Sequence, residues 1–293
     1  MRVVVEATAS LRFSDGSPVR AASAIAPFGD GWLVVQDDTT HAAWLRGGTA
    51  TPIRVIDPVE GLDEFTEAAG TKHLKPDFES ACALPDGGVL LLGSGSTAAR
   101  MRASVVTTGG FTVADRRPVY RSVAATLGIP ESQLNLEGAC LRDGTVRWFQ
   151  RGNTAAGIPS ASADVPLSAL LTTDENQIKS DNPQVYDLST VNGVPPAITD
   201  AVTLPDGRIL VSAAAEDTPN AIDDGPVIAS ALALLDDARV LAVAEIPPGP
   251  AGPWKVEGLA VAEEFPGGVR LPAVVDADDP LTPSAWLTLK VTF

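Results

Sequence analysis

The sequence predicts an all-β fold, a five-bladed β-propeller formed by residues 1–293 as a single domain. Three observations predict it. Five related segments recur at intervals of 56 to 63 residues. The composition includes 26 Gly and 24 Pro, which is typical of short strands joined by tight turns. Finally, a β-branched segment at the N-terminus precedes the first unit and has nothing in that unit to pair with.

Each of the five segments runs from a polar residue through a short apolar strand to a turn. Their first residues are Ser23, Glu79, Glu137, Asp200 and Glu257. The first four segments end in Asp-Gly, at residues 30–31, 86–87, 143–144 and 206–207, and the fifth ends in the looser turn 266–268. Because Asp-Gly is the strongest short signal for a β-hairpin, each segment is predicted to form the innermost strand of a blade.

Further strands follow in the same order within each unit. The predicted second strands are 32–35, 89–92, 146–149, 209–212 and 269–275. The predicted third strands are 43–45, 103–106, 168–171, 229–234 and 285–289. Fourth strands are predicted at 53–56, 111–114, 184–188 and 240–244. Four strands with their turns fill one interval, at the long end for a propeller blade.

The two ends of the chain complement each other. The last unit reaches Phe293 without a fourth strand, whereas residues 2–7 alternate and are β-branched. We expect this N-terminal strand to complete the last blade and close the ring, which removes exposed inner edges. A β-solenoid would use shorter and more regular repeats. A two-sheet sandwich would not repeat Asp-Gly at even intervals, so both are disfavoured.

Composition and charge exclude several classes of partner. The net charge is −16 and the sequence pI is about 4.4. Such an acidic surface repels phosphate backbones and anionic lipids, so we expect neither nucleic-acid nor membrane partners. The first residues lack the features of a signal peptide, and a cytoplasmic location is expected. Cys82 and Cys140 form no disulfide framework and are expected to be reduced and buried.

The first residues of the innermost strands are predicted to converge at one mouth of the central channel. Four of them are carboxylates, and carboxylates that crowd together repel each other. A Ca²⁺ ion would balance them, because it takes six to eight oxygen ligands in a flexible geometry. Ion pairs with neighbouring bases, such as Lys75 beside Glu79 or Lys255 beside Glu257, are the alternative. One carboxyl group kept protonated is a further alternative.

The loops between second and third strands form a second tier on the same face. They contribute Asp37 and His41 in the first unit, Arg151 in the third, and Glu216 with Asp217 in the fourth. These positions differ from blade to blade, as a pocket for an asymmetric small ligand requires. Lys75, Arg151 and Lys255 bring positive charge near the acids and are candidates for holding an anionic group. His41 is a candidate general base, although a lone polar-loop histidine is more often simply solvated.

Several segments resemble an uncharacterised bacterial propeller family, which carries no known function. They are residues 75–79, 92–97, 135–138, 149–153 and 213–218. The Glu-Gly pairs at Glu137 and Glu257 are also similar to those of phytase-like esterase propellers. The ring of Ser23 and four acids resembles that of calcium-activated apyrases, five-bladed propellers with a central calcium. That resemblance implies a metal-site role for Ser23, Glu79, Glu137 and Glu257, and for Asp200 a contact through water.

These residues predict two functions. The first is a calcium-dependent hydrolase of esters or phosphoesters, with the cation at the channel mouth and Arg151 and the lysines holding an anionic substrate. The second is a non-catalytic propeller that binds a small ligand or a protein and keeps a structural metal in its channel. Fold resemblance does not choose between them, since one fold supports many functions.

Overall fold

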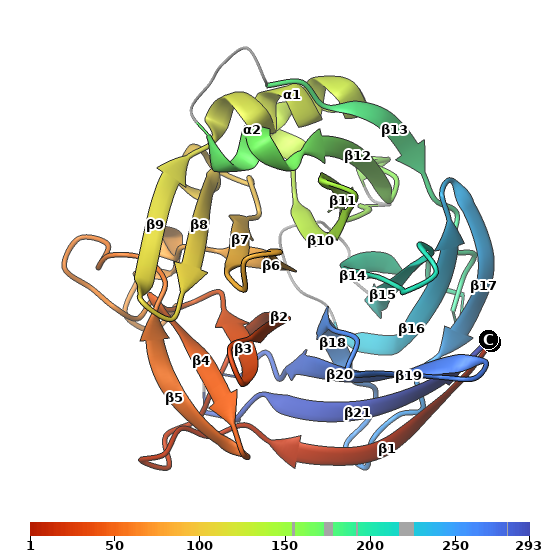
Figure 1. Cartoon of the computed structure of the whole chain (residues 1–293), viewed down its shortest axis with the longest axis horizontal. Helices are drawn as coiled ribbons and strands as arrows, with labels where there is room; N and C mark the ends of the chain where they lie inside the picture. The colour runs from red at the N-terminus through yellow and green to blue at the C-terminus, as the bar shows by residue number, and fades with distance from the viewer. Residues whose placement is uncertain (154–155, 173–177, 192, 217–225, 280) are drawn as a thin grey trace.

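The computed structural model describes residues 1–293 except 154–155, 173–177, 192, 217–225 and 280. Five antiparallel sheets stand around a central channel, and the predicted five-bladed propeller is confirmed (Figure 1). The first two blades contain β2 (Ala22–Phe28), β3 (Gly31–Gln36), β4 (His41–Arg46), β5 (Thr49–Arg54), β6 (Phe78–Ala83), β7 (Val89–Gly93), β8 (Arg102–Thr107) and β9 (Gly110–Asp115). The third and fourth contain β10 (Leu136–Arg142), β11 (Thr145–Gln150), β12 (Ala161–Pro166), β13 (Asp181–Val185), β14 (Ala197–Thr203), β15 (Ile209–Glu216), β16 (Val227–Asp236) and β17 (Arg239–Glu245).

The fifth blade is built from both ends of the chain. It contains β18 (Lys255–Leu259), β20 (Gly268–Asp276), β21 (Ala285–Thr292) and β1 (Arg2–Ser10), with the short β19 (Glu263–Phe265) paired to β20. β1 pairs antiparallel with β21 from Arg2 opposite Thr292 to Ser10 opposite Ala285. The predicted closure of the ring by the N-terminal strand is therefore confirmed.

Between the strands, the described residues form five helical segments. They are η1 (Lys72–Leu74), η2 (Ala98–Arg100), α1 (Arg117–Leu127), η3 (Glu131–Gln133) and α2 (Leu167–Leu171). In the part of the chain that the structure describes, no helix has the length and apolar character needed to cross a membrane. The third strand of the third blade was predicted at 168–171, but that segment is α2, and β12 precedes it. The apolar run was too short to separate a strand from a buried helix by its pattern.

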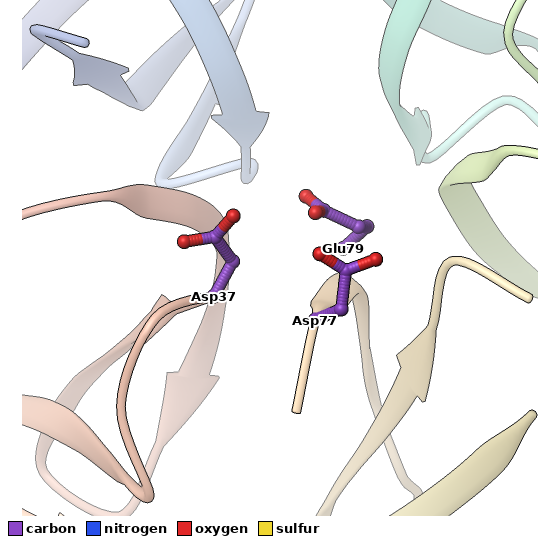
Figure 2. Close-up of side chains that lie close together, drawn as sticks. All are labelled: Asp37, Asp77 and Glu79. Atoms are coloured by element: carbon purple, nitrogen blue, oxygen red, sulfur yellow. The ribbon is translucent and has the colours of Figure 1, made fainter. Parts of the chain in front are cut away.

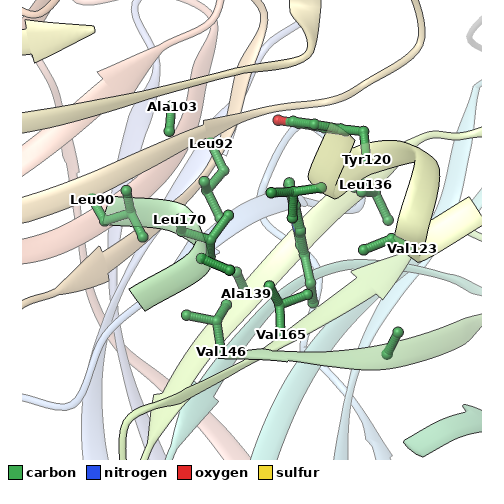
Figure 3. Close-up of a cluster of buried hydrophobic side chains, with 14 of the residues drawn as sticks. Leu90, Leu92, Ala103, Tyr120, Val123, Leu136, Ala139, Val146, Val165 and Leu170 are labelled. Atoms are coloured by element: carbon green, nitrogen blue, oxygen red, sulfur yellow. The ribbon is translucent and has the colours of Figure 1, made fainter. Parts of the chain in front are cut away.

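A large apolar core fills the space between the second and third blades (Figure 3). α1 covers it with Val119, Tyr120 and Val123, which lie on one face of the helix and are buried. The Tyr120 ring meets Trp148 edge-on at 4.7 Å between centroids, and its hydroxyl donates to the Gly93 carbonyl at 2.7 Å. α1 thereby joins two blades and fixes the rim on that side of the ring.

Every innermost strand carries a β-bulge close to its start. The register shifts fall at Ser23, Glu79, Glu137–Gly138, Thr199 and Glu257. A bulge adds a residue to one strand and re-aims its side chain, which is common next to functional sites. Ser23, Glu79, Glu137 and Glu257 thus lie at the bulges of their strands. In the fourth blade Thr199 lies at the bulge, and the acidic residue Asp200 follows it.

Candidate functional site at the channel mouth

Three clusters of charged side chains surround the channel mouth, one each at the second, third and fifth blades. The first is centred on Lys75, which follows η1. Its ammonium group contacts the carboxylate of Asp37, lies 2.6 Å from Asp77 Oδ1 and lies 4.0 Å from Glu79 Oε1. Oxygen atoms of Asp37, Asp77 and Glu79 all lie within 4.8 Å of one another (Figure 2). A single tethered ammonium therefore occupies a three-carboxylate cage.

The acids of this first cluster are driven to different protonation states. Burial would raise the pKa of Asp77, but the charges of Lys75 and Arg100 outweigh it and lower that pKa. Arg100 Nη1 lies 3.1 Å from Asp77 Oδ2, and the Ser94 hydroxyl also donates to this carboxylate. Burial and the neighbouring charges of Asp77 and Asp37 raise the pKa of Glu79 well above its ordinary value. One carboxyl group is thus held ionised beside one that keeps its proton.

The second cluster bridges the third and fourth blades. Arg151 Nη1 donates to Glu137 Oε1 at 2.8 Å, and its Nη2 donates to Glu216 Oε1 at 2.7 Å. Asn135 also donates to Glu137 Oε1 at 2.8 Å. Burial raises the pKa of Glu137 despite the opposing charge of Arg151. Arg151 is therefore committed to two carboxylates, which favours the predicted ion-pair network over a free anion-binding arginine.

The third cluster lies at the start of β18. Lys255 Nζ lies 3.4 Å from Glu257 Oε1 and 2.8 Å from Asp278 Oδ1. Burial raises the pKa of Glu257 well above its ordinary value. Burial and the charges of Asp278 and Asp37 raise the pKa of Asp276 to about 7. The predicted pairings of Lys75 with Glu79 and of Lys255 with Glu257 are both present.

Two buried carboxylate oxygens of the predicted ring acids have no hydrogen-bond partner among the described residues. They are Glu137 Oε2 and Asp200 Oδ1. Asp200 Oδ2 accepts the backbone N–H of Leu259 at 2.6 Å, and burial raises the pKa of Asp200 well above its ordinary value. An orphaned oxygen of this kind costs free energy unless a proton, a water or a cation meets it. Glu137 and Asp200 are therefore candidates for holding a cation.

Hydroxyl groups of the innermost strands connect neighbouring blades. Ser23 donates to the Phe78 carbonyl at 2.6 Å, and Thr199 donates to the Val256 carbonyl at 2.6 Å. The Ser80 hydroxyl donates to the Glu137 carbonyl in the same way. These bonds hold adjacent bulges in a fixed relation around the channel. Ser23 therefore has a structural partner and keeps only its lone pairs for a ligand.

The structure does not bring His41 to the acidic ring. It begins β4, the third strand of its blade, and its Nδ1 lies 3.2 Å from the Thr40 hydroxyl. Burial and the charge of Arg54 lower its pKa, which keeps the imidazole neutral. Within the described part of the chain, no hydrogen bond of His41 reaches a ring carboxylate, so its role as general base receives no support from geometry.

Asp77 is the site residue that the sequence reasoning missed. It precedes Glu79 by two residues in the segment 75–79, and its φ of 59° lies in the left-handed region. The left-handed Asp77 and the bulge at Glu79 interrupt the alternation of an extended strand, so the sequence spacing gave no signal that these two carboxyl groups share a cluster. Asp217, predicted in the fourth blade's loop, lies outside the described residues.

Residues 18–291 match the model of a family described as a family of unknown function, DUF6929. The chain belongs to this family. The match covers all five bulges and the three charged clusters, so the channel mouth is part of the family's common region. No curated protein matches the sequence.

Members of other groups share the fold at low identity. A hypothetical protein from Leishmania major is 14% identical with a TM-score of 0.51, over 99% of this chain and 91% of that one. The mannose phosphorylase MPT-4 from Leishmania mexicana, in complex with phosphate, is 15% identical with a TM-score of 0.51, over 97% and 88%. A glycoside hydrolase candidate from Parabacteroides distasonis is 12% identical with a TM-score of 0.51, over 92% and 87%. These likenesses establish the propeller fold alone.

Proposed function

We propose that this propeller is a calcium-dependent hydrolase whose site is the channel mouth. The observation that carries the proposal is the pair of buried carboxylate oxygens without partners, Glu137 Oε2 and Asp200 Oδ1. Carboxylate oxygens are the ligands that Ca²⁺ prefers. Solved structures of similar fold include a mannose phosphorylase and a glycoside hydrolase candidate, which supports an enzymatic function.

Among the described residues, the group of three acids whose carboxylate oxygens lie within 4.8 Å of one another is Asp37, Asp77 and Glu79, and the ammonium of Lys75 already contacts it. A cation beside the partnerless oxygens would instead draw the other ring acids toward it. Glu137, Asp200 and Glu257 would hold it, since all three are buried and each has a pKa raised by that burial. The charge of Glu137 raises the pKa of both Asp200 and Glu257, so one cation would relieve mutual repulsion among the three. When bound, it would supply Lewis-acid polarisation of a substrate oxygen.

The chain's own residues would handle the proton and the orientation. Glu79 is suited to donate a proton to a leaving group, because its raised pKa keeps it protonated and its side chain remains 17% exposed. Lys75 and Arg100 hold Asp77 ionised, and its negative charge is one of the causes that raise the pKa of Glu79. Arg151 fixes Glu137 through a charge-assisted hydrogen bond and would keep its free oxygen aimed into the channel.

The ion pairs also narrow the substrate. Lys75, Arg151 and Lys255 each face at least two carboxylates, so a phosphoester would have to displace an acid from one of them. A neutral carboxylic ester or glycosidic bond needs no such displacement. We therefore place neutral substrates first and keep phosphoesters as a second class to be tested.

The test is a calorimetric titration of chelator-stripped protein with calcium chloride, with melting followed in parallel. We expect saturable one-site binding that raises the melting temperature. Glu137→Gln should weaken binding at least about tenfold, which is about 1.4 kcal/mol. Glu131→Gln, on exposed η3, is the matched control and should bind like the wild type.

Hydrolysis of nitrophenyl esters, glycosides and phosphates is then compared in the presence of calcium and in the presence of chelator. Absence of both binding and stabilisation would overturn the calcium site.

A second function is favoured by the ion-pair network itself. A mouth in which every cluster carries its own base resembles a rigid scaffold more than an open pocket. On this reading the propeller is a non-catalytic binding module with a structural metal. Calcium binding without turnover of any of the three substrate classes would select it.

A further inference from the structure

A groove of about 360 Å³ lies on the outer rim of the second blade, away from the channel. It is formed where η2, the start of β8, the end of β9 and the first turn of α1 meet. Ala99, Met101 and Val113 provide apolar walls, and Arg102 and Arg117 provide positive charge. A concave site with apolar walls and a few convergent polar groups is typical of small-ligand pockets.

The charge of this groove is opposite to that of the molecule, whose net charge is −16. Asp115 is the one acid among the residues that line it, and it is already paired with Arg117 at 2.6 Å. Arg102 forms no ion pair within the described part of the chain, and its Nε donates to the Ala99 carbonyl. Burial lowers the pKa of Arg102, so its charge is poorly solvated as well as unpaired.

The start of α1 adds to the positive field. Arg116 is its N-cap and Arg117 its first residue, whereas its first turn contains no acidic residue. Helix N-termini favour negative charge, and the carboxylate of Asp115 supplies some of it by accepting the backbone N–H of Arg117 at 2.9 Å. One acid beside two arginines still leaves a net positive charge at the helix start. Arg116 also has no carboxylate partner among the described residues, since its Nε donates to the Leu170 carbonyl at 2.8 Å. The helix start and the groove thus share an excess of cations over acids.

We propose that this groove binds the anionic group of a small ligand, a carboxylate or a phosphate, with an apolar body resting on Met101 and Val113. The guanidinium of Arg102 would supply the charge-assisted hydrogen bonds. The site is independent of the proposed hydrolase. The two sites are connected only through η2, since Ala98 and Ala99 line the groove and Arg100 of the same segment pairs with Asp77.

The full chain is titrated with benzoate and with phenyl phosphate, and binding is followed by the methyl signals of Ala99, Met101 and Val113. Benzyl alcohol serves as the neutral probe. We expect saturable shifts with at least one anion and weaker or no shifts with the alcohol. The preferred anion distinguishes a carboxylate ligand from a phosphate ligand.

Two variants decide the outcome. Arg102→Gln should weaken binding roughly tenfold or more, as expected for loss of a hydrogen bond to a charged group. Arg121→Gln is the matched control, because it is exposed on the same helix, pairs with Glu131 and does not line the groove. Saturable binding lost in the first variant and kept in the second supports the site. No saturable binding by either anion, or equal weakening in both variants, overturns it.

Discussion

The ammonium group of Lys75 takes the place that a metal ion would otherwise occupy among three acidic side chains. Its side chain is only 14% exposed, and the acidic side chains of Asp37, Asp77 and Glu79 surround its ammonium group. The attraction is strong only because the geometry holds all four groups together, and removal of one partner leaves buried charge uncompensated. Lys75 therefore supplies positive charge to the acids of the first cluster without a metal ion. Glu137 Oε2 and Asp200 Oδ1, in contrast, have no hydrogen-bond partner within the described part of the chain.

Replacing this lysine is therefore expected to destabilise the fold. Lys75→Gln should lower the free energy of unfolding by about 3 kcal/mol, because Asp37 and Asp77 lose their shared counter-ion. Urea denaturation measures the loss, and Lys72→Gln, on the exposed surface of η1, should change stability by less than about 0.5 kcal/mol. Added calcium should recover more stability in Lys75→Gln than in the wild type, since the cage then lacks its tethered cation. Equal stability of the two variants would refute this account.

At the scale of elements, the bulged starts of the innermost strands determine the spacing of the ring. The glycines after Glu137 and Glu257 allow adjacent strands to approach closely. A Cβ atom at Gly138 would lie 2.8 Å from the carbonyl carbon of Asp200, and one at Gly258 would lie 2.9 Å from the Cα of Ala24. Both contacts are to backbone that cannot move without shifting a neighbouring blade. The Glu-Gly pairs thus have a packing cause that is independent of catalysis.

Gly138→Ala tests this packing. The added methyl group should force β10 and β14 apart and lower the free energy of unfolding by about 1–3 kcal/mol. It should also weaken calcium binding, because it displaces Glu137 and Asp200 relative to each other. Gly109→Ala is the control, since its Cβ would come no closer than 3.8 Å to Thr107 Oγ1. Urea melts of both variants give the comparison, and a Gly138→Ala protein as stable as the control would contradict the packing argument.

The repeat predicted the elements well because each Asp-Gly turn fixes a hairpin locally. It predicted the site less completely, since the position of a bulge depends on pairing with the next strand. The shift from Asp200 to Thr199 is of this kind, because only the register with Ser212 reveals it. α1 was not predicted either. Its buried face, with Val119 and Val123, is explained by contact with the neighbouring blades rather than by local sequence.

For the whole molecule, closure of the ring concentrates acids that the sequence spreads over five blades. β1 and β21 lock the ends together, so the innermost strands cannot separate to relieve repulsion at the mouth. Burial consequently raises the pKa of Glu79, Glu137, Asp200 and Glu257, and that of Asp276 to about 7. The folded state holds protons that the unfolded chain releases near pH 4.

This linkage predicts a pH dependence of stability. A carboxyl group whose pKa is raised on folding stabilises the fold fully below its unfolded pKa, and that stability is lost as pH rises through the folded pKa. For Asp276 this pH window runs from its ordinary pKa of 3.8 to its folded pKa of about 7. Chelator-treated protein should therefore be more stable at pH 5 than at pH 8 in urea melts. Asp276→Asn should narrow that difference, whereas Asp86→Asn, in an exposed hairpin, should not. Calcium should also reduce the difference in stability between pH 5 and pH 8, because a bound cation replaces the protons. If calcium leaves this difference unchanged, the acids that hold protons are not the ones that bind calcium.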